Sequence, residues 1–241
     1  MKVNSKIKQI RESEKSSHIM MYSNEELYKE GSWLKKTIQT VLDIIPLFRE
    51  YQELHILDLG CGVGRNCISI AQHYQDIKCS IECVDILDFA IEKLISNAKQ
   101  YGVLSSINGI VKPIEEYIIK EDHYDLIIAV SALEHIDSKK SFIKKLIEIE
   151  LGIRKNGIVC FVINSSIKEY DKTTGYEMPV QFEVNLPTEE VQLILEQVFV
   201  NWAVIKSSLQ KQQYDIPRTN GLNDLQTSVV SFVARKCTYI T

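Results

Sequence analysis

The sequence predicts an α/β protein built on a doubly wound, mostly parallel sheet of seven strands. Short apolar stretches alternate with amphipathic stretches between residues 54 and 163, a pattern typical of βαβ units. The stretch 124–130 is almost wholly apolar, as expected of a parallel strand that is covered on both faces. Near the C-terminal end two strand-like stretches follow one another without a helical pattern between them. They are therefore expected to form an antiparallel pair.

An N-terminal helical cap precedes the first strand. Residues 1–22 are polar and are expected to be mobile or to form a lid. Ser23 and Glu26 fit a capping box for a short helix that begins near Asn24. Apolar residues at spacings of three and four predict a longer helix over 34–48.

The rest of the chain is divided into strands and helices by its apolar periodicity and its glycines. Strands are predicted over 54–59, 79–84, 107–111, 124–130 and 157–163, and helices over 65–74, 88–101 and 138–151. A further helix begins at Thr188, and the closing strands lie near 202–209 and 227–235. We predict two parts, an N-terminal helical extension over 1–35 and a main domain over 36–241.

Composition excludes several classes of protein. The chain has 241 residues, 45% of them hydrophobic and 25% charged, which is ordinary for a globular protein and excludes a disordered one. No stretch approaches the roughly 20 apolar residues that cross a bilayer, and the N-terminus lacks the apolar segment of a signal peptide. A formal net charge of −4 argues against nucleic acid as the main partner.

The six cysteines contain no CxxC pair, and no histidine lies at a zinc-ligand spacing from them. We expect buried free thiols and no metal site. Together with the missing signal peptide, free thiols predict a cytoplasmic location.

The strongest chemical signal is the turn that follows the first strand. An apolar strand runs into Asp58 and then into Gly60, Gly62 and Gly64, directly before a helix. Glycines allow a sharp turn and let a ligand approach the backbone closely, and a helix N-terminus offers free N–H groups. This strand–turn–helix context predicts a ligand-binding turn.

Asp85 is the second signal, because it ends the second predicted strand. A carboxylate at this place can accept hydrogen bonds from a ribose diol, and it can also cap the helix that follows. Both features would suit a nicotinamide dinucleotide or an adenosyl ligand. Arg65 stands where the dinucleotide fingerprint has its last glycine, and the Asp58 carboxylate would repel a pyrophosphate but hold an ammonium group. The pattern therefore favours an adenosyl ligand.

These stretches resemble the class I S-adenosylmethionine-dependent methyltransferases. HILDLGCGVGRN is similar to their glycine-rich signature, and IECVDI to their ribose-binding acidic segment. YDLIIAVSALEHID is similar to the fourth-strand segment of small-molecule and quinone-type members. The resemblance covers residues 35–165 well and implies a Rossmann-like fold, S-adenosylmethionine as methyl donor and S-adenosylhomocysteine as product.

The resemblance also implies roles for single residues. Asp58 would hold the methionine ammonium group through water, and the backbone of Gly60, Cys61 and Gly62 would line the methionine and the ribose. Asp85 would bind the ribose hydroxyls. Ile86 would pack on the adenine, and the carbonyl of Val130 would face the ammonium group.

The sequence departs from the family after the third strand. The family often places an aspartate there that binds the adenine amino group, whereas this chain reads Val111-Lys112-Pro113-Ile114-Glu115. Lys112 cannot accept that hydrogen bond, and Pro113 has no N–H to offer. The N–H of Ile114, or Glu115 in a shifted register, is expected to substitute.

His135 is the candidate general base, since it follows the fourth strand at the edge where an open α/β sheet presents its ligand crevice. The competing interpretation is a structural histidine that hydrogen-bonds the next loop. Glu134 is open to the same two interpretations. The preceding residues lack the Asn/Asp-Pro-Pro-aromatic signature of enzymes that methylate nucleobase or glutamine amino groups.

The function that we expect is methyl transfer to a small-molecule acceptor. Residues 164–187 have little periodicity and carry aromatic residues, including Phe182, that would wall a substrate pocket. Two alternatives are a methyltransferase acting on protein or RNA, and a non-catalytic protein that binds adenosyl ligands.

Overall fold

The computed structural model describes residues 5–218 and 221–237, and it confirms the α/β fold class. Seven strands follow one another across the sheet in the order β3-β2-β1-β4-β5-β8-β7. The five parallel strands are β1 (Glu53–Leu59), β2 (Lys78–Asp85), β3 (Ile107–Val111), β4 (Tyr124–Val130) and β5 (Ile153–Asp171). Strands β7 (Ala203–Arg218) and β8 (Gly221–Arg235) are antiparallel to their neighbours. A two-residue strand, β6 (Glu177–Met178), pairs with the end of β5.

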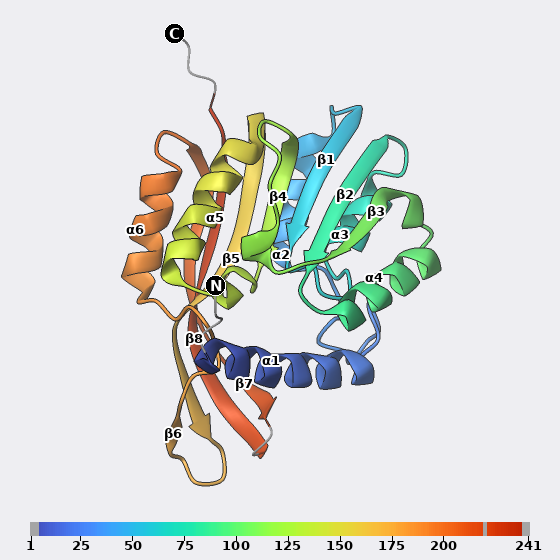
Figure 1. Cartoon of the computed structure of the whole chain (residues 1–241). Coiled ribbons are helices and arrows are strands. Elements are labelled where there is room, and N and C mark those ends of the chain that lie inside the picture. The colour runs from blue at the N-terminus through green and yellow to red at the C-terminus, as the bar shows by residue number, and fades with distance from the viewer. Residues whose placement is uncertain (1–4, 219–220, 238–241) are drawn as a thin grey trace.

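Helices cover both faces of the sheet (Figure 1). Helices α2 (Gln39–Ile44), α3 (Cys67–His73) and α4 (Asp88–Gln100) pack on one face, where the core includes Leu54, Ile56, Ile81 and Leu126. Helices α5 (Lys139–Gly152) and α6 (Thr188–Val198) pack on the other face, where the core includes Leu57, Leu59, Ile127 and Phe161. Because successive strand residues point to opposite faces, β1 and β4 contribute to both cores. Five cysteines are buried as free thiols, as expected, whereas Cys237 is exposed.

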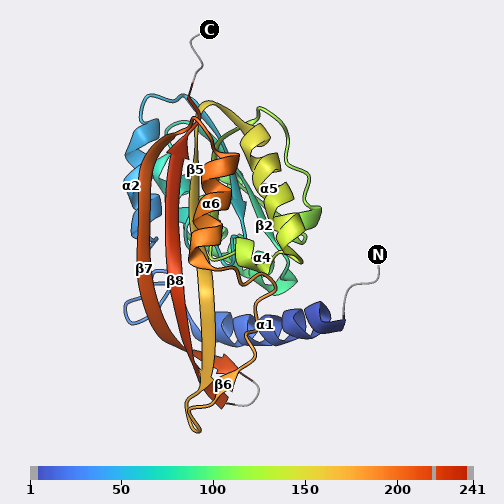
Figure 2. The ribbon, with the colours of Figure 1, turned by 90° about the vertical axis from the view of Figure 1, so that its left-hand side faces the viewer.

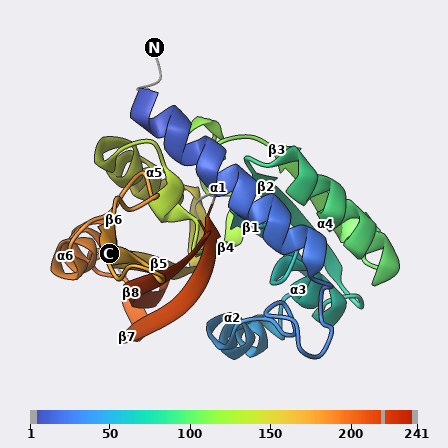
Figure 3. The ribbon, with the colours of Figure 1, turned by 90° about the horizontal axis from the view of Figure 1, so that it is seen from below.

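Helix α1 (Ser5–Asn24) lies across the sheet edge at which the parallel strands end (Figures 1 and 3). The short helix predicted to begin near Asn24 is wrong, because α1 ends there. The predicted helix over 34–48 is reduced to α2 and a 3₁₀ turn at Ile45–Phe48 that contains Pro46. Helix α1 gave no apolar signal because it buries polar residues, Glu14 and Ser17, beside Ile10 and Tyr22.

The last strands are much longer than the sequence predicts. β7 and β8 pair along their length as far as Arg218 and Gly221, and β5 continues to Asp171 through part of the segment expected to be irregular. Figure 2 shows these strands extending past α1, beyond the rest of the sheet. Most of β7 is exposed there, so backbone pairing sustains the strand without an apolar alternation that would reveal it. No helix among the described residues is long and apolar enough to cross a bilayer.

Candidate functional site

A cavity of about 510 Å³ lies between α1 and the carboxyl ends of the parallel strands. Such crevices are the usual ligand sites of open α/β sheets. From α1 the cavity is lined by Lys8, Arg11, Glu12, Glu14, Lys15, His18 and Tyr22. From the strand ends and loops it is lined by Gly60, Asp85, Ile86, Leu87, Pro113, Ile114, Glu115, Ser131, Ala132, His135 and Glu183.

Gly60 of the glycine-rich turn lines the cavity, and the backbone of the turn is held in place by β2. The N–H of Gly60 donates to the carbonyl of Val84 at 2.7 Å. Gly60 has φ +73°, and a Cβ atom there would lie 2.3 Å from the Cβ of Ala132. At Gly62, with φ +53°, a Cβ atom would lie 2.7 Å from the hydroxyl of Tyr22. The turn therefore requires glycine at both positions, for conformation and for close approach.

The carboxylate of Asp85 bonds both the glycine-rich turn and the segment that leads into α4. Its Oδ2 accepts from the N–H of Gly62 at 2.9 Å, and its Oδ1 accepts from the N–H of Leu87 at 2.9 Å. The second bond is made to the residue that precedes α4. The helix itself has no side-chain cap, so Asp85 is not the N-cap that the sequence offered as an alternative to ribose binding. Each carboxylate oxygen accepts more than one hydrogen bond, so these contacts leave capacity toward the cavity.

Asp58 lies beneath the turn and is not among the residues that line the cavity. The side chain is buried, and its Oδ2 has no hydrogen-bond partner among the described residues. Burial raises the pKa of Asp58 to about 7, and the neighbouring charge of Asp85 acts in the same direction. A buried carboxylate oxygen without a partner is unusual and is ready to accept a donor.

The other residues predicted to bind the cofactor fall into two groups. Ile86 and Ile114 line the cavity beside Glu115. Cys61 is buried in the turn and Val130 is the last residue of β4; neither lines the cavity. These placements agree with their predicted positions, and their roles stay predictions.

His135 lines the cavity from a 3₁₀ turn that follows β4, and its environment is acidic. Its Nδ1 lies 3.1 Å from Oε2 of Glu183, and its ring stacks on Phe182 at a centroid distance of 4.8 Å. Burial alone would lower the pKa of His135. The Glu183 hydrogen bond and the charges of Glu14 and Glu134 outweigh it and raise the pKa to about 9. The imidazole is therefore a cation at neutral pH, which favours a donor over a base.

Glu134 stands behind this wall. It is buried, it does not line the cavity, and its Oε1 accepts from the backbone N–H of Asn164 at 3.2 Å and from the side-chain amide of the same residue. These contacts match the structural interpretation of Glu134.

Ion pairs hold α1 over the cavity. Arg11 lies 2.5 Å from Glu115 and 3.2 Å from Glu183. Arg218, at the end of β7, donates to Glu14 and also to Glu169, the latter at 2.7 Å. Helix α1 is thereby tied to the loop after β3 and to the ends of β5 and β7.

Sequence reasoning missed the cavity residues that α1 and the loop before α6 supply: Arg11, Glu14, His18 and Glu183. Their segments were expected to form a lid and a pocket wall, but no residue there was singled out for chemistry except the aromatic ones. One signal was present, since Glu14 and His18 are four residues apart and share a helix face. Among the described residues no cluster of three or more His, Cys, Asp or Glu side chains is arranged to hold a metal ion.

Comparison with known sequences agrees with this geometry. Residues 56–149 match a family model described as a methyltransferase domain. Ubiquinone biosynthesis O-methyltransferase of Rickettsia canadensis is 31% identical over 124 residues, 51% of this chain and 48% of that protein. Norajmaline N-methyltransferase of Rauvolfia serpentina is 28% identical over 97 residues, 39% of this chain and 32% of that protein. The matches thus span about half of the first relative and a third of the second.

Solved structures match over more of the chain. A putative sarcosine dimethylglycine methyltransferase from Galdieria sulphuraria superposes with a TM-score of 0.60 at 12% identity, covering 92% of this chain and 98% of that one. The 1,6-didemethyltoxoflavin-N1-methyltransferase of Burkholderia thailandensis was solved with S-adenosylhomocysteine. It superposes with a TM-score of 0.56 at 14% identity, covering 93% of this chain and 87% of that one. At such identities these likenesses show the fold. The family match identifies residues 56–149 of this chain as a methyltransferase domain.

Proposed function

We propose that this protein transfers the methyl group of S-adenosylmethionine to a small-molecule acceptor. The observation that carries the proposal is one cavity that joins the glycine-rich turn and Asp85 to a second, ionic end with His135 and Glu183. A volume of about 510 Å³ is that of a small-molecule site. Methyl transfer requires donor and acceptor to share such a space, in line and shielded from water.

The residues present fit an adenosyl donor. The Oδ2 atom of Asp58, buried without a partner, suits the ammonium group of the methionine part, through a water at the turn. Asp85 keeps lone pairs for the ribose hydroxyls. Ile86 and Ile114 offer apolar surface to the adenine. The carbonyl of Val130 and the backbone of Gly60, Cys61 and Gly62 complete the predicted set.

The acceptor end favours a small molecule over a macromolecule. Helix α1 covers the cavity and is held there by the ion pairs of Arg11 and Arg218. A polypeptide or RNA chain would have to displace this helix, whereas a small molecule fits beneath it. One of the two sequence relatives is named an O-methyltransferase and the other an N-methyltransferase, so we propose an oxygen or nitrogen nucleophile. In this proposal the N-terminal extension, residues 1–35, acts as the lid of the domain formed by 36–241.

A calorimetric titration of the purified protein with S-adenosylmethionine, S-adenosylhomocysteine and NADH tests the donor site. We expect micromolar binding of both adenosyl ligands and no binding of NADH. Binding of NADH alone would overturn the proposal. Transfer of a radiolabelled methyl group is then measured with phenols and amines in one series and with protein and RNA fractions in another. Labelling of macromolecules only would reject the small-molecule acceptor.

A further inference from the structure

His18 faces the acceptor end of the cavity from the middle of α1. It is one of the cavity-lining residues, and its side chain is 29% exposed. Its ring centroid lies 6.1 Å from that of His135 and 5.7 Å from that of Tyr22. The His18 and His135 rings meet edge to face, at 87°. Two histidines from distant parts of the chain therefore share one cavity.

The hydrogen bonding of His18 defines which ring nitrogen can accept a proton. Nδ1 lies 2.9 Å from the backbone carbonyl oxygen of Glu14. A carbonyl oxygen can only accept, so Nδ1 carries the hydrogen and donates it. In the neutral ring Nε2 is then an acceptor with a free lone pair. Within residues 5–218 and 221–237 no hydrogen bond to Nε2 is formed.

The two histidines therefore differ in what they can do. His135 is bonded to Glu183 and held as a cation by the surrounding carboxylates. A protonated imidazole has no lone pair, so His135 can orient or donate but cannot take up a proton. His18 donates from Nδ1 to the carbonyl of Glu14, and Oε2 of Glu14 lies 3.5 Å from the same nitrogen. Both contacts are on Nδ1, so they leave Nε2 of the neutral ring as an open acceptor.

We propose that His18 is the general base of the methyl transfer, a catalytic residue that α1 delivers to the acceptor. The inference rests on the proposed function. The nucleophile's lone pair forms the new bond to the methyl carbon. The carbon–sulfur bond of the donor breaks with its electron pair left on sulfur, and the proton of the nucleophile passes to Nε2 of His18. The donor sulfur thus loses its positive charge, and the protonated imidazole of His18 gains one.

This assignment narrows the substrate class. A base is needed only where the nucleophile must lose a proton, so the acceptor atom is the oxygen of a hydroxyl group or a nitrogen that carries hydrogen. Nucleophiles without a proton, such as a thioether or an aromatic ring nitrogen, would make no use of His18. It also makes the site complete only when α1 is seated, because the base lies on the helix that closes the cavity.

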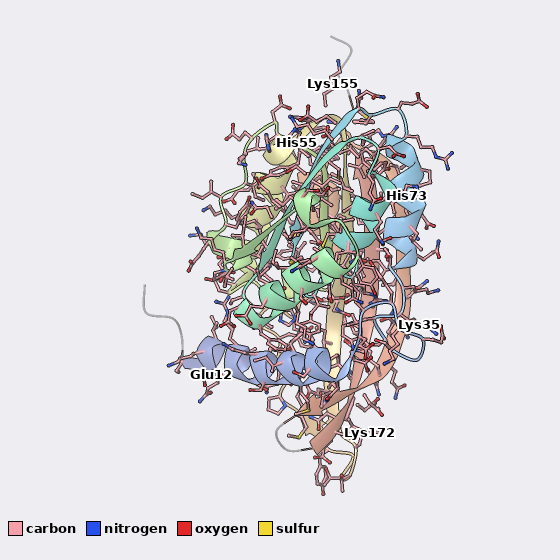
Figure 4. All side chains as sticks on the ribbon, turned by 90° about the vertical axis from the view of Figure 1, so that its right-hand side faces the viewer. Glu12, Lys35, His55, His73, Lys155 and Lys172 are labelled. Carbon is pink, nitrogen blue, oxygen red and sulfur yellow. The ribbon has the colours of Figure 1, made fainter. Side chains whose placement is uncertain are left out.

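The variant His18→Asn tests the role, since the asparagine amide keeps a donor near the position of Nδ1 but supplies no base. We expect S-adenosylhomocysteine affinity within about threefold of the unmodified protein. We expect kcat for caffeic acid or tryptamine to fall by about 100-fold or more, the usual contribution of a general base. The matched controls are Ser16→Ala, at an exposed position of α1, and His73→Asn on α3, which Figure 4 labels. Both should keep the unmodified rate.

Two results would overturn the assignment. One is a kcat of the His18→Asn variant within about threefold of that of the unmodified protein. The other is methylation of nicotinamide, whose ring nitrogen has no proton, without methylation of caffeic acid or tryptamine. The unmodified protein could bind adenosyl ligands but methylate none of the three acceptor probes. In that case the tautomer of His18 tests whether it can act as the base. Imidazole ¹⁵N–¹H correlation spectra of the S-adenosylhomocysteine complex should show His18, identified by its loss in His18→Asn, with hydrogen on Nδ1 only. Hydrogen on Nε2 refutes the base. Failure to bind any adenosyl ligand would instead refute the proposed function.

Discussion

The guanidinium of Arg218 donates a hydrogen bond to the carboxylate of Glu14, joining residues 204 positions apart in the chain. Both side chains are buried, and the same guanidinium also donates to both oxygens of Glu169 at 2.7 and 3.0 Å. Arg218 thus connects the end of β7 to α1 and to β5. Since Glu14 also holds Nδ1 of His18 through its carbonyl, this ion pair fixes the part of α1 that faces the acceptor.

We expect Arg218→Leu to lower the free energy of unfolding by about 3–5 kcal/mol, because removing one partner of a buried ion pair leaves uncompensated charges behind. Here two carboxylates, those of Glu14 and Glu169, would lose their counter-charge. Urea denaturation measures the loss. Hydrogen exchange should also show faster exchange of the α1 amides.

Lys172→Leu is the matched control for this prediction. Lys172, in the turn after β5 (Figure 4), pairs with Asp215 of β7 at 2.7 Å, but both side chains are nearly half exposed. Solvent-exposed pairs contribute about 0–1 kcal/mol. Equal destabilisation by the two substitutions would contradict a special role for Arg218.

The pKa of Asp58, raised to about 7 by burial, predicts a pH-dependent ligand affinity. The carboxyl group is neutral below that pH and ionised above it, and an ammonium group binds the ionised form. Affinity for S-adenosylhomocysteine should therefore be highest above pH 7. It should fall by up to roughly tenfold per unit as the pH drops further below 7. Calorimetry at several pH values, in buffers of different ionisation enthalpy, should also detect the released proton.

Asp58→Asn copies the neutral carboxyl and serves as the control. Its affinity should be lower at pH 8 and nearly flat between pH 5 and 8. If the affinity of this variant still changed with pH as steeply as that of the unmodified protein, a group other than Asp58 would be responsible.

Asp85→Asn should weaken binding of S-adenosylhomocysteine by about 10- to 100-fold while the protein stays folded. The substitution removes charge-assisted hydrogen bonds, each worth about 1.5–3 kcal/mol, whereas the asparagine oxygen can keep one of the two backbone contacts. Asp76→Asn, on an exposed turn before β2, should bind as the unmodified protein does. Unchanged affinity in a folded Asp85→Asn variant would remove Asp85 from the ligand site.

The sequence by itself determined the sheet, its parallel strands and the glycine-rich turn with Asp58 and Asp85. These features are local, since apolar periodicity and glycine spacing are set by neighbouring residues. Its three spaced motifs also indicated the methyltransferase resemblance, which the family match over residues 56–149 supports. Tertiary structure decided the rest of the site. Helix α1 is polar, and its buried Glu14 becomes stable only against Arg218 from the far end of the chain. Likewise, His135 becomes a cation through its tertiary contact with Glu183. The contact of His18 with the Glu14 carbonyl is local to α1, but only the fold brings that histidine into the cavity. Protonation states depend on three-dimensional neighbours, and no pattern along the chain encodes them.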